Sequence, residues 1–166
     1  NNKKKYRWIW FDRNLIKEKT LFKIQKRIIY AIEAVIDIAL NSGLKPVQNI
    51  SIARRQKIPK RYLEQTLQIL VKKNILVGSR GPKGGYRLAR ERRKIKISEI
   101  IKTVSNDETK EICKSELSKK VIEPMINKIS GKCFKFLDEI SVEEICKVAK
   151  KKNLQKHPEK KVDFVI

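Results

Sequence analysis

Residues 52–90 read IARRQKIPKRYLEQTLQILVKKNILVGSRGPKGGYRLAR, and this stretch decides the fold. A short helix is predicted at about 50–56, a break at 57–59, and a longer helix at about 60–73. The longer helix carries apolar side chains at helical spacing, namely Leu63, Leu67, Leu70 and Val71. Two helices joined by a turn of three or four residues have the layout of a helix-turn-helix.

The glycine-rich end of this stretch predicts a β-hairpin rather than a phosphate-binding loop. Short β-prone runs at 75–77 and 86–88 flank the sequence GSRGPKGG. A phosphate-binding P-loop needs a lysine directly after its last glycine, and neither Gly84 nor Gly85 precedes one. A hairpin after a helix-turn-helix is a wing that contacts the DNA backbone. We expect Gly84 and Gly85 to adopt positive φ and to allow a close approach to another strand.

Further helices are predicted on both sides of this unit. A helix at 24–39 precedes it, with Asn41-Ser42-Gly43 as its stop signal. A short helix starts near Ile97 with Ser98 as its N-cap, and residues 141–144 read as a capping box. Between them lies an amphipathic helix at 124–139, with Pro124 in its first turn. Its apolar stripe consists of Met125, Ile129, Cys133, Phe136, Leu137 and Ile140.

The predicted fold is mainly α with a small β-hairpin. A winged helix-turn-helix domain at 21–105 follows a basic and aromatic extension at 1–20. A linker loop at 106–123 leads to a dimerisation helix and a short C-terminal helix at 124–149, and a basic tail at 150–166 ends the chain. The stripe of the helix at 124–139 either folds back onto the first helix or pairs with a second subunit. We favour the pair, because the remaining elements look too few to bury both faces and DNA-binding proteins of this size usually bind two-fold sites.

Charge is distributed unevenly along the chain. The 166 residues carry a net charge of +23, and residues 43–96 hold 16 basic and 2 acidic side chains. Residues 107–145 hold 7 basic and 9 acidic side chains, so a general lysine-rich drift does not explain the pattern. The basic charge therefore indicates a region that meets a polyanion, above all nucleic acid.

The sequence supports neither a membrane protein nor an enzyme. No apolar run approaches the roughly 20 residues that span a bilayer, so we expect no membrane association and a cytoplasmic bacterial protein; an A·T-driven composition also suits a plastid stroma. The single histidine, His157, lies in the tail, and no nucleophile–base pair is discernible, so no enzymatic activity is expected. The three cysteines are too widely spaced for a zinc pair or a disulfide framework.

Three segments together resemble the Rrf-two family of bacterial winged-helix transcriptional regulators, IscR-like members in particular. They are YAIEAVIDIAL (30–40), the opening stretch (52–90) and FLDEISVEEI (136–145). The most specific part is the pair YLEQ (62–65) and RGPKGGYRLA (80–89). The resemblance implies a homodimer joined through the helix at 124–139, with double-stranded DNA as its partner.

The resemblance also implies which residues contact DNA. Base-reading residues would be Arg61, Glu64, Gln65 and Arg80. Glu64 would accept a hydrogen bond from cytosine N4 in the major groove, and Arg80 would enter a narrow A·T-rich minor groove. Phosphate contacts would come from Lys60, Lys83 and Arg87, which position the protein without specifying sequence.

Two departures from the family pattern concern the turn and the sensor. Lys57 and Pro59 stand where the family has a glycine and a serine cap, and positive φ at a lysine costs about 1–2 kcal/mol. The loop at 106–123 holds only Cys113, so the usual three-cysteine iron–sulfur site is absent and no cofactor is expected. Cys133 is expected to be a buried apolar residue of its helix.

Other sensing schemes stay open. Cys113 could hold a cluster together with carboxylates such as Glu108, Glu111 or Glu116, or with ligands from a partner subunit. It could also act alone as a redox-sensitive thiol. We favour loss of metal sensing, with control by a regulatory partner protein or by abundance.

The predicted function is sequence-specific regulation of transcription, more often repression than activation, by a homodimer on a palindromic site. The alternative is a sequence-neutral RNA- or nucleoid-binding protein, which the basic extension and tail favour.

Overall fold

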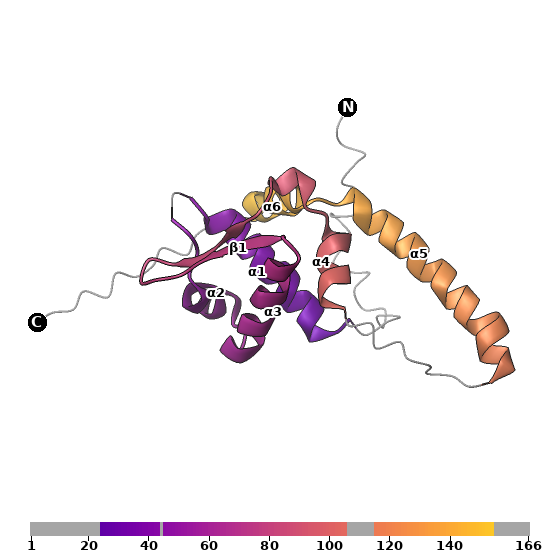
Figure 1. Ribbon diagram of the computed structural model, residues 1–166. Coiled ribbons are helices and arrows are strands. Elements are labelled where there is room, and N and C mark those ends of the chain that lie inside the picture. The colour runs from indigo at the N-terminus through magenta and orange to yellow at the C-terminus, as the bar shows by residue number, and fades with distance from the viewer. Residues whose placement is uncertain (1–23, 44, 106–114, 155–166) are drawn as a thin grey trace, which may run out of the picture.

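The computed structural model describes residues 24–43, 45–105 and 115–154. The predicted extension at 1–20, Cys113 and most of the tail lie outside the described residues. The element order is α1 (Lys26–Asn41), α2 (Asn49–Gln56), α3 (Lys60–Lys72), β1 (Leu76–Ser79), β2 (Gly85–Leu88), α4 (Ile97–Val104), α5 (Glu123–Glu139) and α6 (Val142–Lys151). The fold prediction is confirmed: in the described part of the chain, six α-helices and a two-stranded antiparallel hairpin, whose tip projects beyond the helices, form a winged-helix arrangement (Figure 1).

Helix α1 is the centre of the core. It contacts α2, α3, α4 and α6, and its inward side chains Ala31, Ala34, Val35 and Ile38 are fully buried. From α3 the core receives Leu63, Leu67 and Leu70, as their helical spacing predicts. Because these three leucines face inward, the opposite face of α3 is left to solvent.

The wing is an antiparallel hairpin with one additional pairing. Leu76 lies opposite Leu88, and Ser79 lies opposite Gly85. Val47, just before α2, exchanges two backbone hydrogen bonds with Tyr86, of 2.9 and 2.8 Å, so β2 is also bound on its other edge. A side chain at position 85 would place its Cβ 2.5 Å from the carbonyl oxygen of Val47, which is the close approach expected there.

The prediction of positive φ at Gly84 is wrong. The glycines with positive φ are Gly81, at 101°, and Gly85, at 155°. Gly84 is needed for a different reason, because a Cβ there would lie 2.3 Å from the carbonyl oxygen of Ser79. The tight hairpin tip therefore excludes side chains at Gly84 by contact rather than by backbone conformation.

The turn between α2 and α3 retains the left-handed residue that glycine would favour. Lys57 has φ 53° and ψ 34°, and its backbone N–H donates to the carbonyl of Ala53. Pro59 takes the N-cap position of α3 without a side-chain cap. The turn is thus not reshaped, and the lysine bears the strain of about 1–2 kcal/mol.

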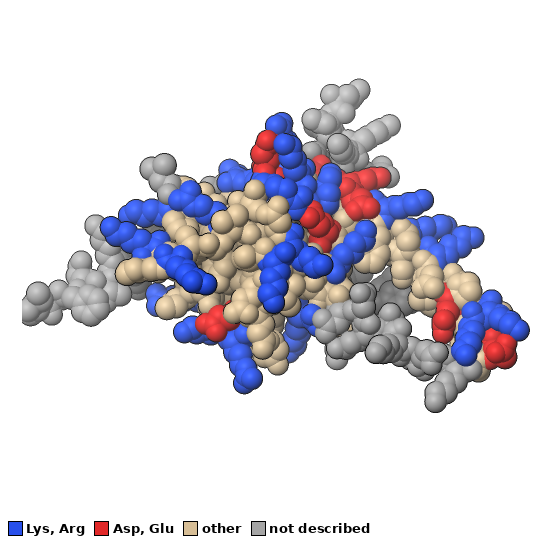
Figure 2. All heavy atoms as spheres, in the orientation of Figure 1, with Lys and Arg blue, Asp and Glu red and all other residues tan. Residues whose placement is uncertain are grey.

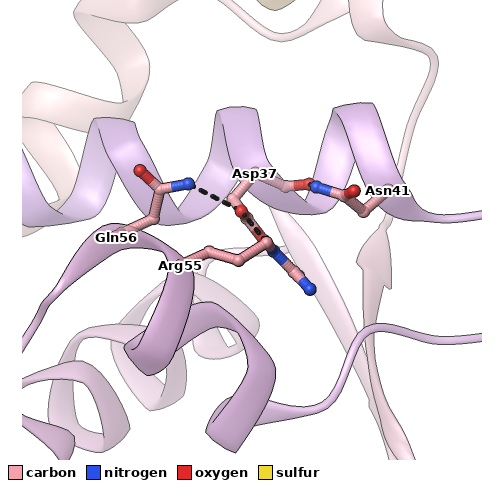
Figure 3. Close-up of polar contacts among 4 residues, drawn as sticks. All are labelled: Asp37, Asn41, Arg55 and Gln56. Carbon is pink, nitrogen blue, oxygen red and sulfur yellow. Dashed lines mark hydrogen bonds and ion pairs between the residues drawn. The ribbon is translucent and has the colours of Figure 1, made fainter. Parts of the chain in front are cut away.

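A buried carboxylate connects α1 to the end of α2 (Figure 3). Asp37 Oδ1 accepts hydrogen bonds from Arg55 Nε at 2.9 Å and from Gln56 Nε2 at 2.7 Å, and Asp37 Oδ2 accepts one from Arg55 Nη2 at 2.7 Å. The side chains of Asp37 and Arg55 are only 1% and 15% exposed. This network fixes the last turn of α2, directly before the turn that leads into α3.

The start of α4 differs from the prediction. Lys96, not Ser98, occupies the N-cap position, and Ser98 is buried. Its hydroxyl donates instead to the carboxylate of Asp138 on α5. Ser141 does cap α6 as predicted, because its Oγ accepts from the backbone of Glu144 while the Glu144 carboxylate accepts from the Ser141 N–H.

Helix α5 is preceded by further helical residues that the sequence assigned to the linker. Residues 116–117 are helical and Ser118–Ile122 form a π-helical turn that runs into α5. In a regular helix a proline ring clashes with the carbonyl four residues earlier, and the wider π turn lets the helix continue through Pro124.

No residue of α5 is buried, and the helix extends away from the rest of the fold (Figure 1). Met125, Ile129 and Phe136 on its apolar stripe are 49%, 40% and 44% exposed. Cys133 is exposed as well, so the prediction that it is buried is wrong for the single subunit. Within the described part of the chain, no helix is long and apolar enough to cross a bilayer.

Candidate nucleic-acid interface

A groove of about 710 Å³ lies between the start of α2, the outer face of α3 and the wing. Its lining includes Asn49 from α2, Glu64 and Gln68 from α3, and Ser79, Arg80 and Tyr86 from the hairpin. Glu64 and Arg80 therefore border the same depression although they come from different elements. A single duplex lying along this groove would meet both side chains.

The predicted contact residues of α3 all lie on its solvent face. Lys60, Arg61, Glu64 and Gln65 are exposed. The Glu64 carboxylate has two neighbours, since Asn49 Nδ2 donates to its Oε1 at 3.2 Å and Lys60 Nζ lies 4.0 Å from the same oxygen. An exposed ion pair of this length contributes little stability, so Lys60 remains available to a phosphate.

The remaining predicted residues lie in the wing; Arg80 lines the groove, whereas Lys83 and Arg87 are not among its lining residues. Arg80, Lys83 and Arg87 are exposed, the first two near the hairpin tip and the third on β2. Gln48 Nε2 donates to the backbone oxygen of Pro82 at 3.2 Å, which ties the wing tip to the residue before α2. The wing and the helix-turn-helix are therefore connected by this bond at the tip and by the Val47–Tyr86 pairing close to it on β2.

The charge of the surface agrees with a polyanionic ligand. Figure 2 shows lysine and arginine side chains projecting around the hairpin end of the molecule, while acidic side chains gather where α4, α5 and α6 meet. Glu64 is one of only two acidic residues in the segment 43–96. A lone carboxylate in a basic surface weakens non-specific attraction, so its presence favours a role in reading bases.

The described residues contain no group of three or more histidine, cysteine, aspartate and glutamate side chains that could hold a metal ion. Cys133 is exposed on α5, and Cys146 is buried in α6, where desolvation raises the pKa of its thiol. The hypothesis of a site at Cys113 falls on residues outside the described part and stays a prediction.

Some residues of the groove were not predicted. Gln48 and Asn49 stand just before the predicted helix at 50–56. The only sequence signal for a role in the groove is their amide side chains, which lie near a helix predicted to read bases. The exposed apolar side chain of Ile50, 57% accessible, also borders the groove. Their contribution depends on the fold, which brings the start of α2 against the middle of α3.

Comparison with known proteins places these features in one family. The model of the Rrf2 family, described as an iron-dependent transcriptional regulator, matches residues 24–148. The transcriptional regulator IscR of Xenorhabdus nematophila is 36% identical over 124 residues, which cover 71% of this chain and 75% of that protein. The IscR of Cronobacter sakazakii is 41% identical over 75 residues, and this match spans less than half of either protein, 45% and 46%.

Solved structures agree with the sequence relatives. The IscR of T. potens matches with a TM-score of 0.67 and 31% identity, covering 82% of this chain and 94% of that one. CymR, the global cysteine regulator of B. subtilis, matches with a TM-score of 0.58 and 26% identity, covering 77% of this chain and 98% of that one.

Proposed function

Because the chain belongs to the Rrf2 family of transcriptional regulators, we propose that it binds a palindromic DNA site as a homodimer and regulates transcription by reading bases with α3 and the wing. The observation that carries this proposal is the shared groove of Glu64 and Arg80. Residues that read different grooves of one duplex must face the same way, and these two do.

In this arrangement α3 enters the major groove and the wing reaches the adjacent minor groove. The Glu64 carboxylate accepts from cytosine N4, with Arg61 and Gln65 as neighbouring base contacts. Arg80 enters the minor groove, where an A·T-rich sequence deepens the negative potential. Lys60, Lys83 and Arg87 hold phosphates and set the register, since such contacts carry no sequence information.

The exposed stripe of α5 supports the homodimer. Soluble monomers rarely expose a contiguous apolar surface of this kind, and α5 presents Met125, Ile129, Cys133 and Phe136 along one side. Pairing with α5 of a second subunit would bury that side. A two-fold axis through the pair would then place the two α3 helices on half-sites about one helical turn apart.

The cysteines do not fit the three-thiolate cluster site expected of an iron-sensing relative. The predicted linker contains Cys113 alone, Cys133 lies on the apolar side of α5, and Cys146 of α6 is buried in the hydrophobic core. Iron–sulfur clusters are held mainly by cysteine thiolates, and Cys133 and Cys146 lie on two different helices. We therefore keep the prediction that a partner protein or the abundance of the regulator controls its activity.

Selection of binding sites from a random DNA pool tests this function. An enriched palindrome is expected, and Glu64→Ala should then relax the preference at one base pair of each half-site with little effect on non-specific affinity. Lys83→Ala should weaken binding to all sequences and lower the slope of log K against log salt by about 0.9 per subunit. Lys151→Ala, which removes an exposed lysine from α6, is the matched control and should change neither quantity.

A pool without enrichment, bound with a steep salt dependence, would instead support the sequence-neutral alternative that the basic segment 43–96 favours. Wild-type base preferences in the Glu64→Ala protein would exclude base reading by Glu64.

A further inference from the structure

Asn49 is the first residue of α2, and its side chain reaches the middle of α3. Its Nδ2 donates to Oε1 of Glu64 over 3.2 Å. Both residues line the groove assigned to DNA. The contact joins the two helices of the helix-turn-helix at the carboxylate proposed to read a base.

The other end of the same amide is unsatisfied. Asn49 Oδ1 is buried and has no hydrogen-bond partner among the described residues. An orphaned buried carbonyl loses its bonds to water without replacement, so an asparagine here contributes less to stability than an apolar side chain of similar size would. Reversing the amide would not remove the cost, because it would aim the carbonyl at a carboxylate.

A residue that lowers stability at the edge of a binding groove needs a reason in binding. The bond from Asn49 occupies one oxygen of Glu64, while Oε2 has no partner within the described part of the chain. The carboxylate is thereby restricted to orientations in which Oε2 is the available acceptor. Lys60 also approaches Oε1, but at 4.0 Å it restrains the group weakly.

Resting on the proposed function, we propose that Asn49 is a positioning residue for base readout: it holds the Glu64 carboxylate so that one oxygen faces the exocyclic amine of a cytosine. Asn49 sharpens the preference at the base pair read by Glu64 and does not itself touch that base. Prior restraint lowers the entropy that the carboxylate loses when the complex forms.

The test uses the full-length protein and a site selected from the random pool. The base pair read by Glu64 is located first, as the position at which Glu64→Ala loses its preference. Asn49→Leu keeps the approximate size of the side chain, removes the donor and removes the orphaned carbonyl. We expect its preference at that base pair to fall about two- to tenfold, as for loss of one hydrogen bond, while its unfolding temperature stays equal or rises. A merely structural role predicts the reverse, lower stability with unchanged preference.

Two further variants distinguish the effect of Asn49 from the effects of its neighbours Glu64 and Lys60. In the Glu64→Ala background the Asn49→Leu substitution should have no additional effect on preference, because the residue acts through Glu64. Lys60→Met removes the second neighbour of Oε1 and should lower affinity for all sequences while preserving the preference.

The outcomes distinguish this inference from the function on which it rests. An unchanged preference in Asn49→Leu, when Glu64→Ala has lost its preference, overturns the positioning role and leaves the proposed function intact. An equal loss in the presence and absence of Glu64 also overturns it, since Asn49 would then act on DNA directly. If Glu64→Ala alters no position, base reading by Glu64 fails and the positioning role fails with it.

Discussion

Removing the carboxylate of Asp37 should destabilise the fold by about 3–5 kcal/mol, the usual effect of leaving one partner of a buried ion pair without the other. The structure supports the upper part of this range for Asp37→Ala. The carboxylate is 1% exposed and accepts three hydrogen bonds, two of them from one guanidinium in a bidentate arrangement. The substitution leaves Arg55 charged in a site where its side chain is only 15% exposed.

Urea unfolding followed by circular dichroism measures the effect, at one fixed protein concentration because the proposed dimer would contribute to stability. A loss of 3–5 kcal/mol corresponds to a fall of roughly 6–20 °C in unfolding temperature for a chain of this size. In the double variant Asp37→Leu, Arg55→Met, the guanidinium that faces Asp37 is also removed. Most of the stability should therefore return, since apolar residues of similar volume often replace a buried ion pair without loss.

Glu33→Gln is the comparison variant and should not lower stability, because it removes a carboxylate one turn earlier on α1 that has no hydrogen bond or ion pair within the described part of the chain. If Asp37→Ala lowered the free energy of unfolding by less than about 1 kcal/mol, the reasoning would be refuted, because an ion pair at the solvent-exposed surface contributes no more than that. A double variant as unstable as the single one would also refute it, by showing that the cost does not come from removing the carboxylate that Arg55 contacts while Arg55 stays in place.

Four further outcomes follow from individual residues. Lys57→Gly should raise stability by about 0.5–1 kcal/mol in thermal unfolding, because relief of left-handed strain exceeds the added freedom of the unfolded chain. Gly84→Ala should weaken DNA binding by distorting the wing tip, whereas Gly43→Ala, whose Cβ would meet nothing within 4 Å, should bind like wild type. With the other two cysteines replaced by serine, maleimide labelling of Cys133 should slow as protein concentration rises, because the dimer covers the apolar side of α5. Burial raises the pKa of Glu33 above its ordinary value of 4.5, so the ionised carboxylate lowers stability at pH 7 and the Glu33→Gln protein should be more stable than wild type. The difference in stability should vanish as the pH falls below 4.5, because the carboxyl is then protonated in both the folded and the unfolded chain.

Local patterns were sufficient for the elements that carry the proposed interface. The spacing of Leu63, Leu67 and Leu70 predicted α3 and, with it, the solvent face that holds Glu64. Glycines and a proline between two β-prone runs predicted the wing. Each of these signals is contained in a short stretch of sequence, so neither prediction needed knowledge of the tertiary fold.

Features that depend on distant residues were missed. Ser98 satisfies the local rule for an N-cap, but its hydroxyl bonds to Asp138, which is far away in sequence. Val47 pairs with Tyr86 as a single residue, too short for any strand pattern. The helical residues before Pro124 were missed because proline is typical of the first turn of a helix, so the helix was predicted to begin at Pro124. The π turn at Ser118–Ile122, which accommodates the proline, has no recognised sequence signal.

Asp37 and Lys57 explain together how this chain retains a helix-turn-helix after losing the glycine of the turn. A lysine in the left-handed region favours release of the turn by about 1–2 kcal/mol, and release would shift α3 relative to α1. The two residues just before Lys57, Arg55 and Gln56, are both bound to the buried Asp37 carboxylate. Because breaking that network costs more than the turn would gain, the end of α2 stays in place and the strain remains at Lys57. The proposed orientation of Glu64 toward DNA would thus depend on Asp37, through the turn that leads into α3, as well as on Asn49 beside it.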